Sequence, residues 1–203
     1  MRIFLAGASG VIGRRLIPLL IDRGHTVAGM TRSEGRAPEL RALGTEPVVC
    51  DVYDADALSA AVVAFGPDLV LHQLTDLPDD AGDLATHAVH NARMRRDGTR
   101  NLLRASRQAD DARVIAQSVA WTMAPGAGAD AVAFLEESVL ADRGTVIRYG
   151  QFYGPGTYYE NEIPPQPRVS IDTAAQRTVD ALSAPPGILT VVDEEPRTNA
   201  RVR

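Results

Sequence analysis

Three glycines near the amino terminus have a spacing that suggests phosphate binding. The segment Gly7-Ala8-Ser9-Gly10-Val11-Ile12-Gly13 follows the apolar run Arg2–Ala6 and precedes an amphipathic run that begins at Val11. Between a strand and a helix, such glycines allow a tight turn, close approach of the backbone to a diphosphate, and close packing of the helix on the sheet. The first N–H groups of that helix would be free donors. We therefore expect a dinucleotide to bind at Gly7, Ser9, Gly10, Val11, Ile12 and Gly13.

The residues after the second expected strand indicate which dinucleotide binds. In this architecture the residue beyond that strand meets the adenosine ribose, and a carboxylate there favours NAD. This chain has Thr31-Arg32-Ser33, followed by Arg36, so it lacks the carboxylate and offers guanidinium groups for a 2′-phosphate. The sequence therefore predicts NADP(H) as cofactor, although both arginines could instead be solvated loop charges.

Other candidate residues follow later strands. Asp51 could accept a hydrogen bond from an adenine amino group or cap a loop. Ser118 ends the fifth expected strand, at the crevice where parallel sheets bind ligands, so it could bond a substrate oxygen or simply cap a helix. Trp121 and Met123 could form a substrate wall or pack in the core, and loop tyrosines such as Tyr153 could supply a phenol or only pack.

Histidines are weaker candidates. His72 ends an apolar run and is expected to be a structural histidine. His87 and His90 lie three residues apart on an expected helix, but the sequence places no third or fourth ligand beside them, so we expect no metal.

Several ordered motifs give the chain a family resemblance. They are GASGVIG, CDVYD, DLVLHQLT, DGTRNLLRAS, VIAQS, VIRYGQFYGPGT and SIDTAAQRTVDAL. In this order they resemble the extended short-chain dehydrogenase/reductase superfamily, in particular its NAD-dependent epimerase/dehydratase family. The similarity runs from Met1 to about Val192.

The resemblance implies roles for specific positions. The glycine turn would hold the diphosphate, with Ile12 packed on it and Arg32 on the ribose phosphate. Asp51 and Val52 would flank the adenine. Gln73, Leu74 and Thr75 would run beneath the nicotinamide ribose, Ser118 would take the place of the family's catalytic serine or threonine, and the segment from Tyr149 to Gly156 would line the substrate side. From these we take Ser118 and Tyr153 as candidate catalysts and expect the substrate to contact Trp121, Gln151, Tyr153 and Tyr158.

The chain departs from the family at its proton relay. Hydride-transferring members carry a tyrosine and a lysine four residues apart on the helix after the fifth strand, where the lysine lowers the tyrosine pKa. Here those places fall at Gly128 or Ala129 and at Val132 or Ala133. All 21 basic residues are arginine, and no tyrosine lies between Tyr53 and Tyr149. The chain is also shorter than a complete member, so we interpret it as a truncated, atypical member without the Tyr/Lys pair.

Alternating strand and helix patterns predict the elements that position these residues. We expect an α/β fold with a doubly wound parallel Rossmann sheet of about seven strands and a reduced C-terminal substrate lid, in a single domain over 1–203 with 150–170 as a substrate-side loop. The expected strands are Arg2–Ala6, Thr26–Met30, Glu46–Cys50, Leu69–His72, Val114–Ser118, Thr145–Tyr149 and Ile188–Val192. The expected helices are Val11–Arg23, Asp56–Phe65, Leu84–Ser106, Asp130–Ala141 and Asp172–Leu182, the last capped by Asp172.

Composition narrows the range of partners and compartments. With 203 residues, 45% of them hydrophobic, and a net charge of −5, the chain is typical of a globular domain and lacks the clustered positive charge of a nucleic-acid or anionic-membrane binder. One cysteine, no apolar leader and no membrane-length apolar stretch favour the cytoplasm. We expect a small-molecule substrate and consider a homodimer, because the long helix from Leu84 could pair two subunits.

Three functions remain open at this point. The first is an NADP(H)-dependent, epimerase/dehydratase-like oxidoreductase that acts on a small organic carbonyl or alcohol through a non-standard relay. The second is a non-redox isomerase, cyclase or lyase of specialised metabolism on the same fold. The third is a non-catalytic protein that responds to NADP(H).

Overall fold

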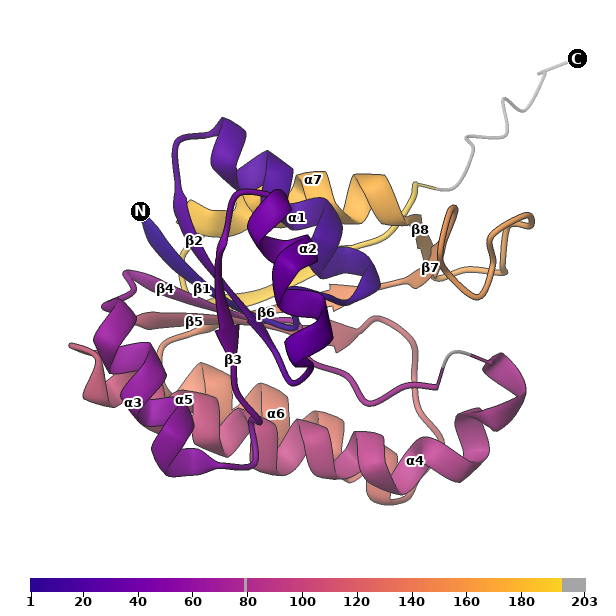
Figure 1. The fold of residues 1–203 in the computed structure, drawn as a ribbon. Helices are drawn as coiled ribbons and strands as arrows, with labels where there is room; N and C mark the ends of the chain where they lie inside the picture. Colours follow the sequence, from indigo (N-terminus) through magenta and orange to yellow (C-terminus); the bar gives the residue numbers. More distant parts are fainter. Residues whose placement is uncertain (79, 195–203) are drawn as a thin grey trace, which may run out of the picture.

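A parallel sheet forms the centre of the molecule (Figure 1). The structure is a computed structural model and describes residues 1–78 and 80–194. Seven strands pair in the order β3-β2-β1-β4-β5-β6-β9, all parallel. They are β1 (Arg2–Ala6), β2 (Thr26–Thr31), β3 (Glu46–Val49), β4 (Leu69–His72), β5 (Arg113–Val119), β6 (Thr145–Tyr149) and β9 (Gly187–Val191). Because β1 lies between β2 and β4, the strand order reverses there, which opens a crevice at the carboxyl ends of these strands.

Helices cover both faces of this sheet (Figure 1). One face carries α1 (Val11–Asp22), α2 (Ala37–Ala42) and α7 (Ile171–Asp180). The other carries α3 (Ala55–Phe65), α5 (Thr99–Gln108) and α6 (Ala127–Ala141), with α4 (Leu84–Arg93) extending beyond the sheet. Short helical turns η1 (Glu34–Arg36), η2 (Ala81–Asp83) and η4 (Ala181–Ser183) join these elements. The predicted doubly wound α/β fold is confirmed.

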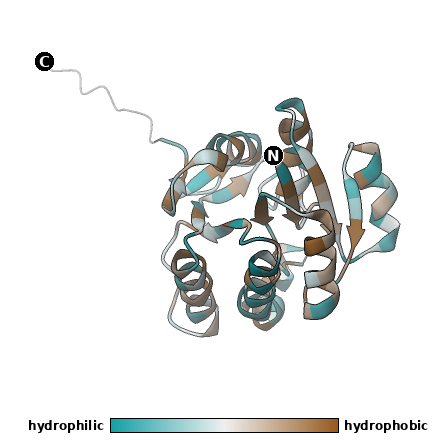
Figure 2. Cartoon of the chain, turned by 90° about the vertical axis from the view of Figure 1, so that its left-hand side faces the viewer, coloured by the Kyte–Doolittle hydropathy of each residue, from teal (hydrophilic) through white to brown (hydrophobic). Residues whose placement is uncertain are grey.

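Two apolar cores explain why the strands read as continuous hydrophobic runs. One lies between the sheet and α1 and α7, and includes Leu5, Leu16 and Ile171. The other lies between the sheet and α3, α5 and α6, and includes Phe4 and Leu102. A parallel sheet is buried on both faces, so its strands show little polar alternation. Figure 2 shows brown on the central strands and teal on parts of the surrounding helices.

The expected long helix from Leu84 to Ser106 is not continuous. It divides into α4, the wider turn η3 (Met94–Gly98) with π-helical hydrogen bonding, and α5. The turn η3 buries Met94 and Arg95, at 4% and 9% exposure, although a run with three arginines is typical of a solvated helix face. Wider turns of this kind occur frequently at functional sites.

The C-terminal half adds a small second sheet and one corrected cap. Strands β7 (Gln151–Tyr153) and β8 (Arg168–Ser170) pair in parallel, so the segment expected as a loop over 150–170 is paired at both of its ends. The helix α7 is capped by Ser170, whose Oγ accepts from the Thr173 N–H, and not by Asp172. Asp172 instead pairs with Arg15 at 2.8 Å.

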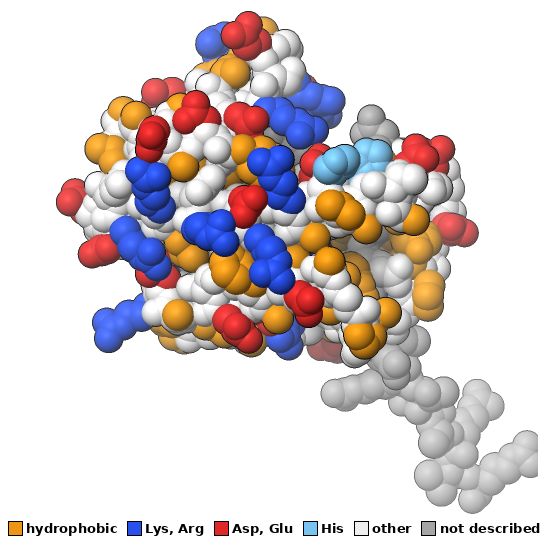
Figure 3. Space-filling model, turned by 90° about the horizontal axis from the view of Figure 1, so that it is seen from below, with side chains coloured by type: hydrophobic (Ala, Val, Ile, Leu, Met, Phe, Trp, Pro, Cys, Tyr) orange, Lys and Arg blue, Asp and Glu red, His pale blue; other side chains and the backbone are white. Residues whose placement is uncertain are grey.

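The outer face of α4 and α5 carries mixed charge rather than one sign. Figure 3 shows arginines interspersed with acidic side chains on this lower face. Asp97 lies between Arg93 and Arg100, at 3.4 and 2.9 Å, and Arg104 reaches Asp56 at 2.8 Å. Within the described part of the chain, no helix is long and apolar enough to cross a membrane.

Candidate active site

A side chain would clash with the backbone at two of the three glycine positions of this turn. Gly7 has φ +93°, and a Cβ there would lie 2.6 Å from the Gln73 carbonyl oxygen. A Cβ at Gly13 would lie 2.2 Å from the Gly7 carbonyl oxygen, because α1 packs directly on the turn. A Cβ at Gly10 would come only within 3.3 Å of Gly7 O and would otherwise point into open space. Gly7 and Gly13 are therefore needed for the fold, and Gly10 keeps a space empty.

The amino terminus of α1 keeps its hydrogen-bond donors open. Gly10 caps the helix without a side-chain hydrogen bond, and no acidic residue lies in the first turn. The first intrahelical bond runs from Arg14 N–H to Gly10 O. The N–H groups of Val11, Ile12 and Gly13 therefore have no intrahelical acceptor and lie at the positive end of the helix dipole.

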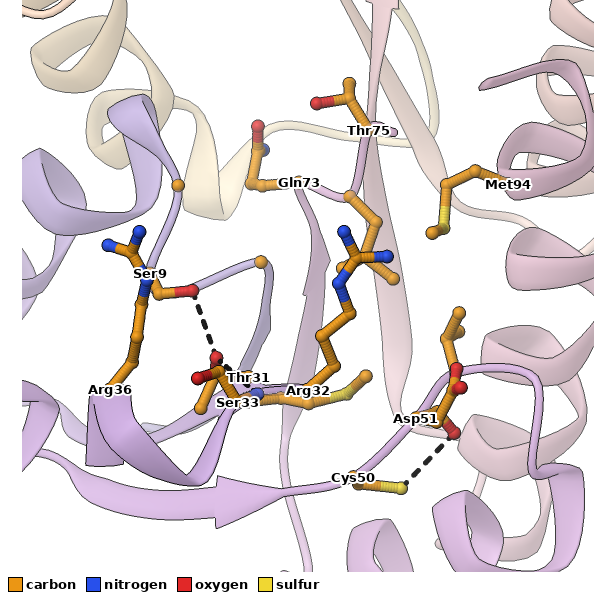
Figure 4. A pocket seen from close by; sticks show the side chains of 15 residues that line it. Ser9, Thr31, Arg32, Ser33, Arg36, Cys50, Asp51, Gln73, Thr75 and Met94 are labelled. Atoms are coloured by element: carbon orange, nitrogen blue, oxygen red, sulfur yellow. Dashed lines mark hydrogen bonds between the residues drawn. The ribbon is translucent and has the colours of Figure 1, made fainter. Parts of the chain in front are cut away.

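Both predicted arginines face the same cavity as the glycine turn. The cavity, about 240 Å³, is lined by Arg32 and Arg36, and Figure 4 shows both guanidinium groups extending into it. Arg32 lies 3.5 Å from Asp76 and its side chain is 69% exposed, so it is only loosely held. Thr31 Oγ1 lies 3.1 Å from Ser9 Oγ, which joins the second strand to the glycine turn.

The loop after β3 closes one side of the cavity. The Asp51 carboxylate accepts a hydrogen bond from the Tyr53 N–H at 2.9 Å, so it caps the loop while it lines the cavity. Val52 is 3% exposed, and its carbonyl accepts from Asn101 Nδ2 at 2.9 Å.

The floor of the cavity comes from the end of β4, where Gln73, Leu74 and Thr75 line it. Gln73 is 4% exposed, and its carboxamide lies close to the buried Tyr149 hydroxyl without a hydrogen bond of standard geometry. A buried amide without a good partner is costly.

His72 holds this floor in place. Its Nδ1 accepts a hydrogen bond from the Leu74 N–H at 3.3 Å, so Nε2 carries the proton and donates to Thr99 Oγ1 at 3.0 Å. The ring is fully buried, and burial, with a smaller contribution from the charge of Arg95, lowers the pKa of His72 to about 4. The expected structural role is confirmed by these contacts.

This environment predicts a pH dependence of stability. The unfolded state binds a proton at His72 below pH 6.5, whereas the folded state binds it only near pH 4. Stability is therefore fully present above pH 6.5 and falls by about 3 kcal/mol as the pH drops to 4. Urea unfolding at pH 7, 5.5 and 4.5 measures this loss. In His72→Gln the loss should shrink by most of that amount, and an unchanged pH dependence would refute the assignment.

Most predicted cofactor residues meet at this one cavity. Among the predicted positions, its lining includes Gly7, Ser9, Gly10, Thr31, Arg32, Ser33, Arg36, Asp51, Val52, Gln73, Leu74 and Thr75. Val11, Ile12, Gly13 and Ser118 are not among the lining residues. The sequence reasoning missed three apolar lining residues, Met30, Cys50 and Met94. The first two end strands that run into the crevice, which is a usable signal, whereas Met94 enters through the unpredicted turn η3.

The hydroxyl of the candidate catalyst Ser118 already forms a hydrogen bond inside the protein. Its hydroxyl donates to Glu136 Oε1 at 2.6 Å, and the same carboxylate accepts from Arg148 through both oxygens. Burial alone would raise the pKa of Glu136, but the hydrogen bonds from Arg148 and Ser118 and the nearby positive charges outweigh it and lower the pKa. Glu136 is therefore a buried carboxylate anion, and the sequence analysis did not identify it as a candidate.

A second cavity, about 330 Å³, lies beside this pair. It is lined by Val119, Ala120, Trp121, Thr122, Met123, Ala129, Val132, Ala133, Glu136 and Arg148. Trp121 is 39% exposed, so it lines a cavity and is not packed in the core. The small residues of α6 stand where the family's tyrosine and lysine would lie, which leaves this space open.

The other predicted substrate residues bind neighbouring loops. The Tyr153 hydroxyl donates to Asp193 at 2.8 Å, and this bond, followed by burial, raises its pKa. Gln151 donates to the Pro165 carbonyl and accepts from Tyr159 at 3.1 Å. Tyr158 donates to the Pro78 carbonyl. The hydroxyls of Ser118 and Tyr153 therefore donate to different carboxylates and do not act together. Gln151, Tyr153 and Tyr158 line neither of the two cavities.

The fold and the glycine-lined crevice define a Rossmann-type nucleotide-binding domain. The chain belongs to the NAD(P)H-binding family, whose model matches residues 7–142. Its fold is that of UDP-glucose 4-epimerase from Thermus thermophilus in complex with NAD, at 20% identity and a TM-score of 0.77, covering 96% of this chain and 78% of that one. The expected likeness to NAD-dependent epimerases is confirmed at the level of fold.

Several curated relatives are reductases, and two of them illustrate the range. A 3-diazoavenalumate denitrifying reductase of a Streptomyces species is 38% identical over 185 residues, which cover 80% of this chain and 60% of that protein. A 4-hydroxy-2-methyl-3-oxo-4-farnesyl-3,4-dihydroquinoline-1-oxide ketoreductase of Stigmatella aurantiaca is 31% identical over 126 residues, covering 62% of this chain and 36% of that protein. The chain thus spans less than two thirds of the length of either relative.

Proposed function

We propose that this chain is an NADPH-dependent reductase whose substrate accepts a hydride without needing a proton from the protein. The observation that supports the proposal is the pairing of a cavity lined by the glycine turn, Arg32 and Arg36 with a helix α6 that has neither tyrosine nor lysine. Among the described residues, no cluster of three or more histidine, cysteine, aspartate or glutamate side chains could hold a metal.

The residues of the cavity fit a dinucleotide with an extra phosphate. The open N–H groups at the start of α1 would hold the diphosphate, since Gly10 leaves room for it. Arg32 and Arg36 would pair with the 2′-phosphate. When bound, NADPH supplies a hydride.

A carbonyl acceptor fits the remaining residues poorly. Reduction of a ketone places negative charge on oxygen, which needs a proton donor in reach. The hydroxyl of Ser118 donates to Glu136, and that of Tyr153 donates to Asp193. With these donors engaged, an acceptor that develops no oxyanion is favoured.

An aryl diazo group is such an acceptor. A hydride added to the terminal nitrogen of an aryl diazonium ion gives an aryl diazene, which loses N₂ and leaves the hydrogen on the ring carbon. One hydride and one diazonium ion therefore give one arene and one N₂, and no other proton is consumed. The 38% identity to a reductase named for a diazo carboxylate supports this class of substrate.

The test uses 3-diazoavenalumate and NADPH deuterated at C4 of the nicotinamide. We expect one NADPH to be oxidised and one N₂ to be released per diazo group lost, and the deuterium to pass from NADPH to the carbon that carried the diazo group or, through exchange of the diazene N–D, to water. Diazo loss without NADPH oxidation would indicate a non-redox reaction. The absence of both reactions would overturn the proposal.

Ser118→Ala separates this proposal from the second candidate, a carbonyl reductase like the Stigmatella relative. If Ser118 only positions Glu136, diazo turnover should change by no more than about threefold. If Ser118 donates a proton to a developing oxyanion, ketone turnover should fall about 100-fold. A roughly 100-fold loss of ketone turnover in Ser118→Ala, relative to the wild type, would favour the carbonyl reaction. A homodimer and a cytoplasmic location remain predictions from the sequence.

A further inference from the structure

The region between η3 and α6 contains more positive than negative charge. Arg95 enters from η3 and Arg148 from β6, and the carboxylate that influences both guanidinium groups is Glu136. The hydrogen bonds of Glu136 go to Arg148 and Ser118. His72, the other titratable group that senses Arg95, is held neutral at pH 7. The cluster therefore keeps one uncompensated positive charge.

That charge resides on Arg95, which is 9% exposed. Among the described residues, its side chain has one hydrogen bond, from Nη1 to the sulfur of Met123 at 3.9 Å. A guanidinium carries five N–H donors, and a sulfur is a weak acceptor. Burying a cation this way is costly unless an anion completes the site.

Met123 connects Arg95 with the cavity beside Trp121. Its sulfur faces Arg95, and Met123 itself lines the cavity. Its terminal methyl lies 3.0 Å from where a Cβ at Gly128 would be, so it fills space that any larger residue at position 128 would need. Methionine is flexible and can move to admit a ligand.

We infer that the cavity beside Trp121 binds the carboxylate of an aromatic substrate, with Arg95 as its charge partner. The ring lies along Trp121 and the small side chains of Ala129, Val132 and Ala133. Met123 shifts so that the carboxylate reaches the guanidinium of Arg95. The inference extends the proposed function, because it requires the diazo substrate to carry an acidic group, but the anion site itself can be tested without turnover.

The experiment compares trans-cinnamate with trans-cinnamamide by calorimetry, with and without saturating NADP⁺. Wild-type protein should bind the carboxylate about tenfold or more tightly than the amide. Arg95→Met keeps an unbranched, flexible side chain, although a shorter one, and removes the charge. It should lose that preference while binding the amide as before, and Arg95→Lys should restore part of it.

Controls separate binding from folding and from the proposed function. Arg100→Met makes the same change on the exposed face of the neighbouring helix and should bind both probes like the wild type. Because no carboxylate of the described residues contacts Arg95, Arg95→Met should melt at the wild-type temperature or above. Equal binding of both probes by the wild type, failure to bind cinnamate, or an Arg95→Met variant that keeps the preference would overturn the inference. If the protein binds cinnamate as expected but oxidises no NADPH, the inferred anion site is supported and only the proposed reductase function is refuted.

Discussion

Arg32→Asp is expected to abolish the preference for NADPH and to favour NADH. The wild-type guanidinium extends into the cavity, where it would pair with the 2′-phosphate. Replacing it loses a charge-assisted contact and places a second carboxylate near Asp76, which lies 3.5 Å from Arg32. The ratio of NADPH to NADH affinity should fall about 100-fold, with NADPH losing most of the binding. Fluorescence titration of both reduced dinucleotides measures the ratio.

The matched control for this change is Arg41→Asp. Arg41 lies on α2 and is exposed, and it does not line the cavity, so the same change in net charge should leave the ratio within about threefold. If both variants shift the ratio equally, the effect is one of net charge. If neither variant shifts the ratio, Arg32 does not bind the 2′-phosphate.

Gly10→Ala is expected to lower the affinity for NADPH and NADH alike by about 100-fold, because a methyl group would displace the diphosphate from at least one charge-assisted bond to the open N–H groups of α1. The backbone of Gly10 is extended, so alanine fits it. The loss of folding stability should be about 1 kcal/mol or less. Calorimetric titration and urea unfolding of the same protein measure both effects.

Gly13→Ala provides the contrast. Its Cβ would lie 2.2 Å from Gly7 O, so the helix must move away from the turn, and stability should fall by about 3 kcal/mol. The two glycines thus separate binding from folding. Wild-type affinity in Gly10→Ala would show that the diphosphate does not approach this position.

The strands were predictable from the sequence because burial on both sheet faces leaves long apolar runs. Every expected strand of the main sheet is present, with ends shifted by one residue at most. The three-residue strands β7 and β8 are too short to show a pattern, and their pairing depends on contacts between distant segments. Helix α2 was missed although Pro38, in its first turn, and Glu39 are start signals.

The candidate cofactor cavity was also largely predictable, because the topology brings the carboxyl ends of β1, β2 and β4 together. Most of its residues follow these strands, β3 or the glycine turn, so their order along the chain determines where they lie in space, whereas Met94 enters from η3. Ser118 was the exception. It also ends a strand, but its hydroxyl points to Glu136, and no local pattern reveals the direction of a side chain.

The second cavity could not be predicted from local pattern. Arg95 lies in a run of arginines that is typical of a solvated helix, and its burial depends on η3 packing against α6. The only signal in the sequence was indirect. Ala129, Val132 and Ala133 line this cavity, at positions where the family resemblance implies a larger tyrosine and lysine.

The glycine turn and the two arginines stand at the centre of the proposed NADPH site. Titration of the wild-type protein with NADPH and NADH tests this site most directly, with fluorescence of Trp121, the single tryptophan, and of the nicotinamide as readouts. We expect saturable binding of one NADPH per chain, at least about tenfold tighter than NADH. Equal affinities would contradict the arginine assignment, and no binding of either dinucleotide would contradict the site as a whole.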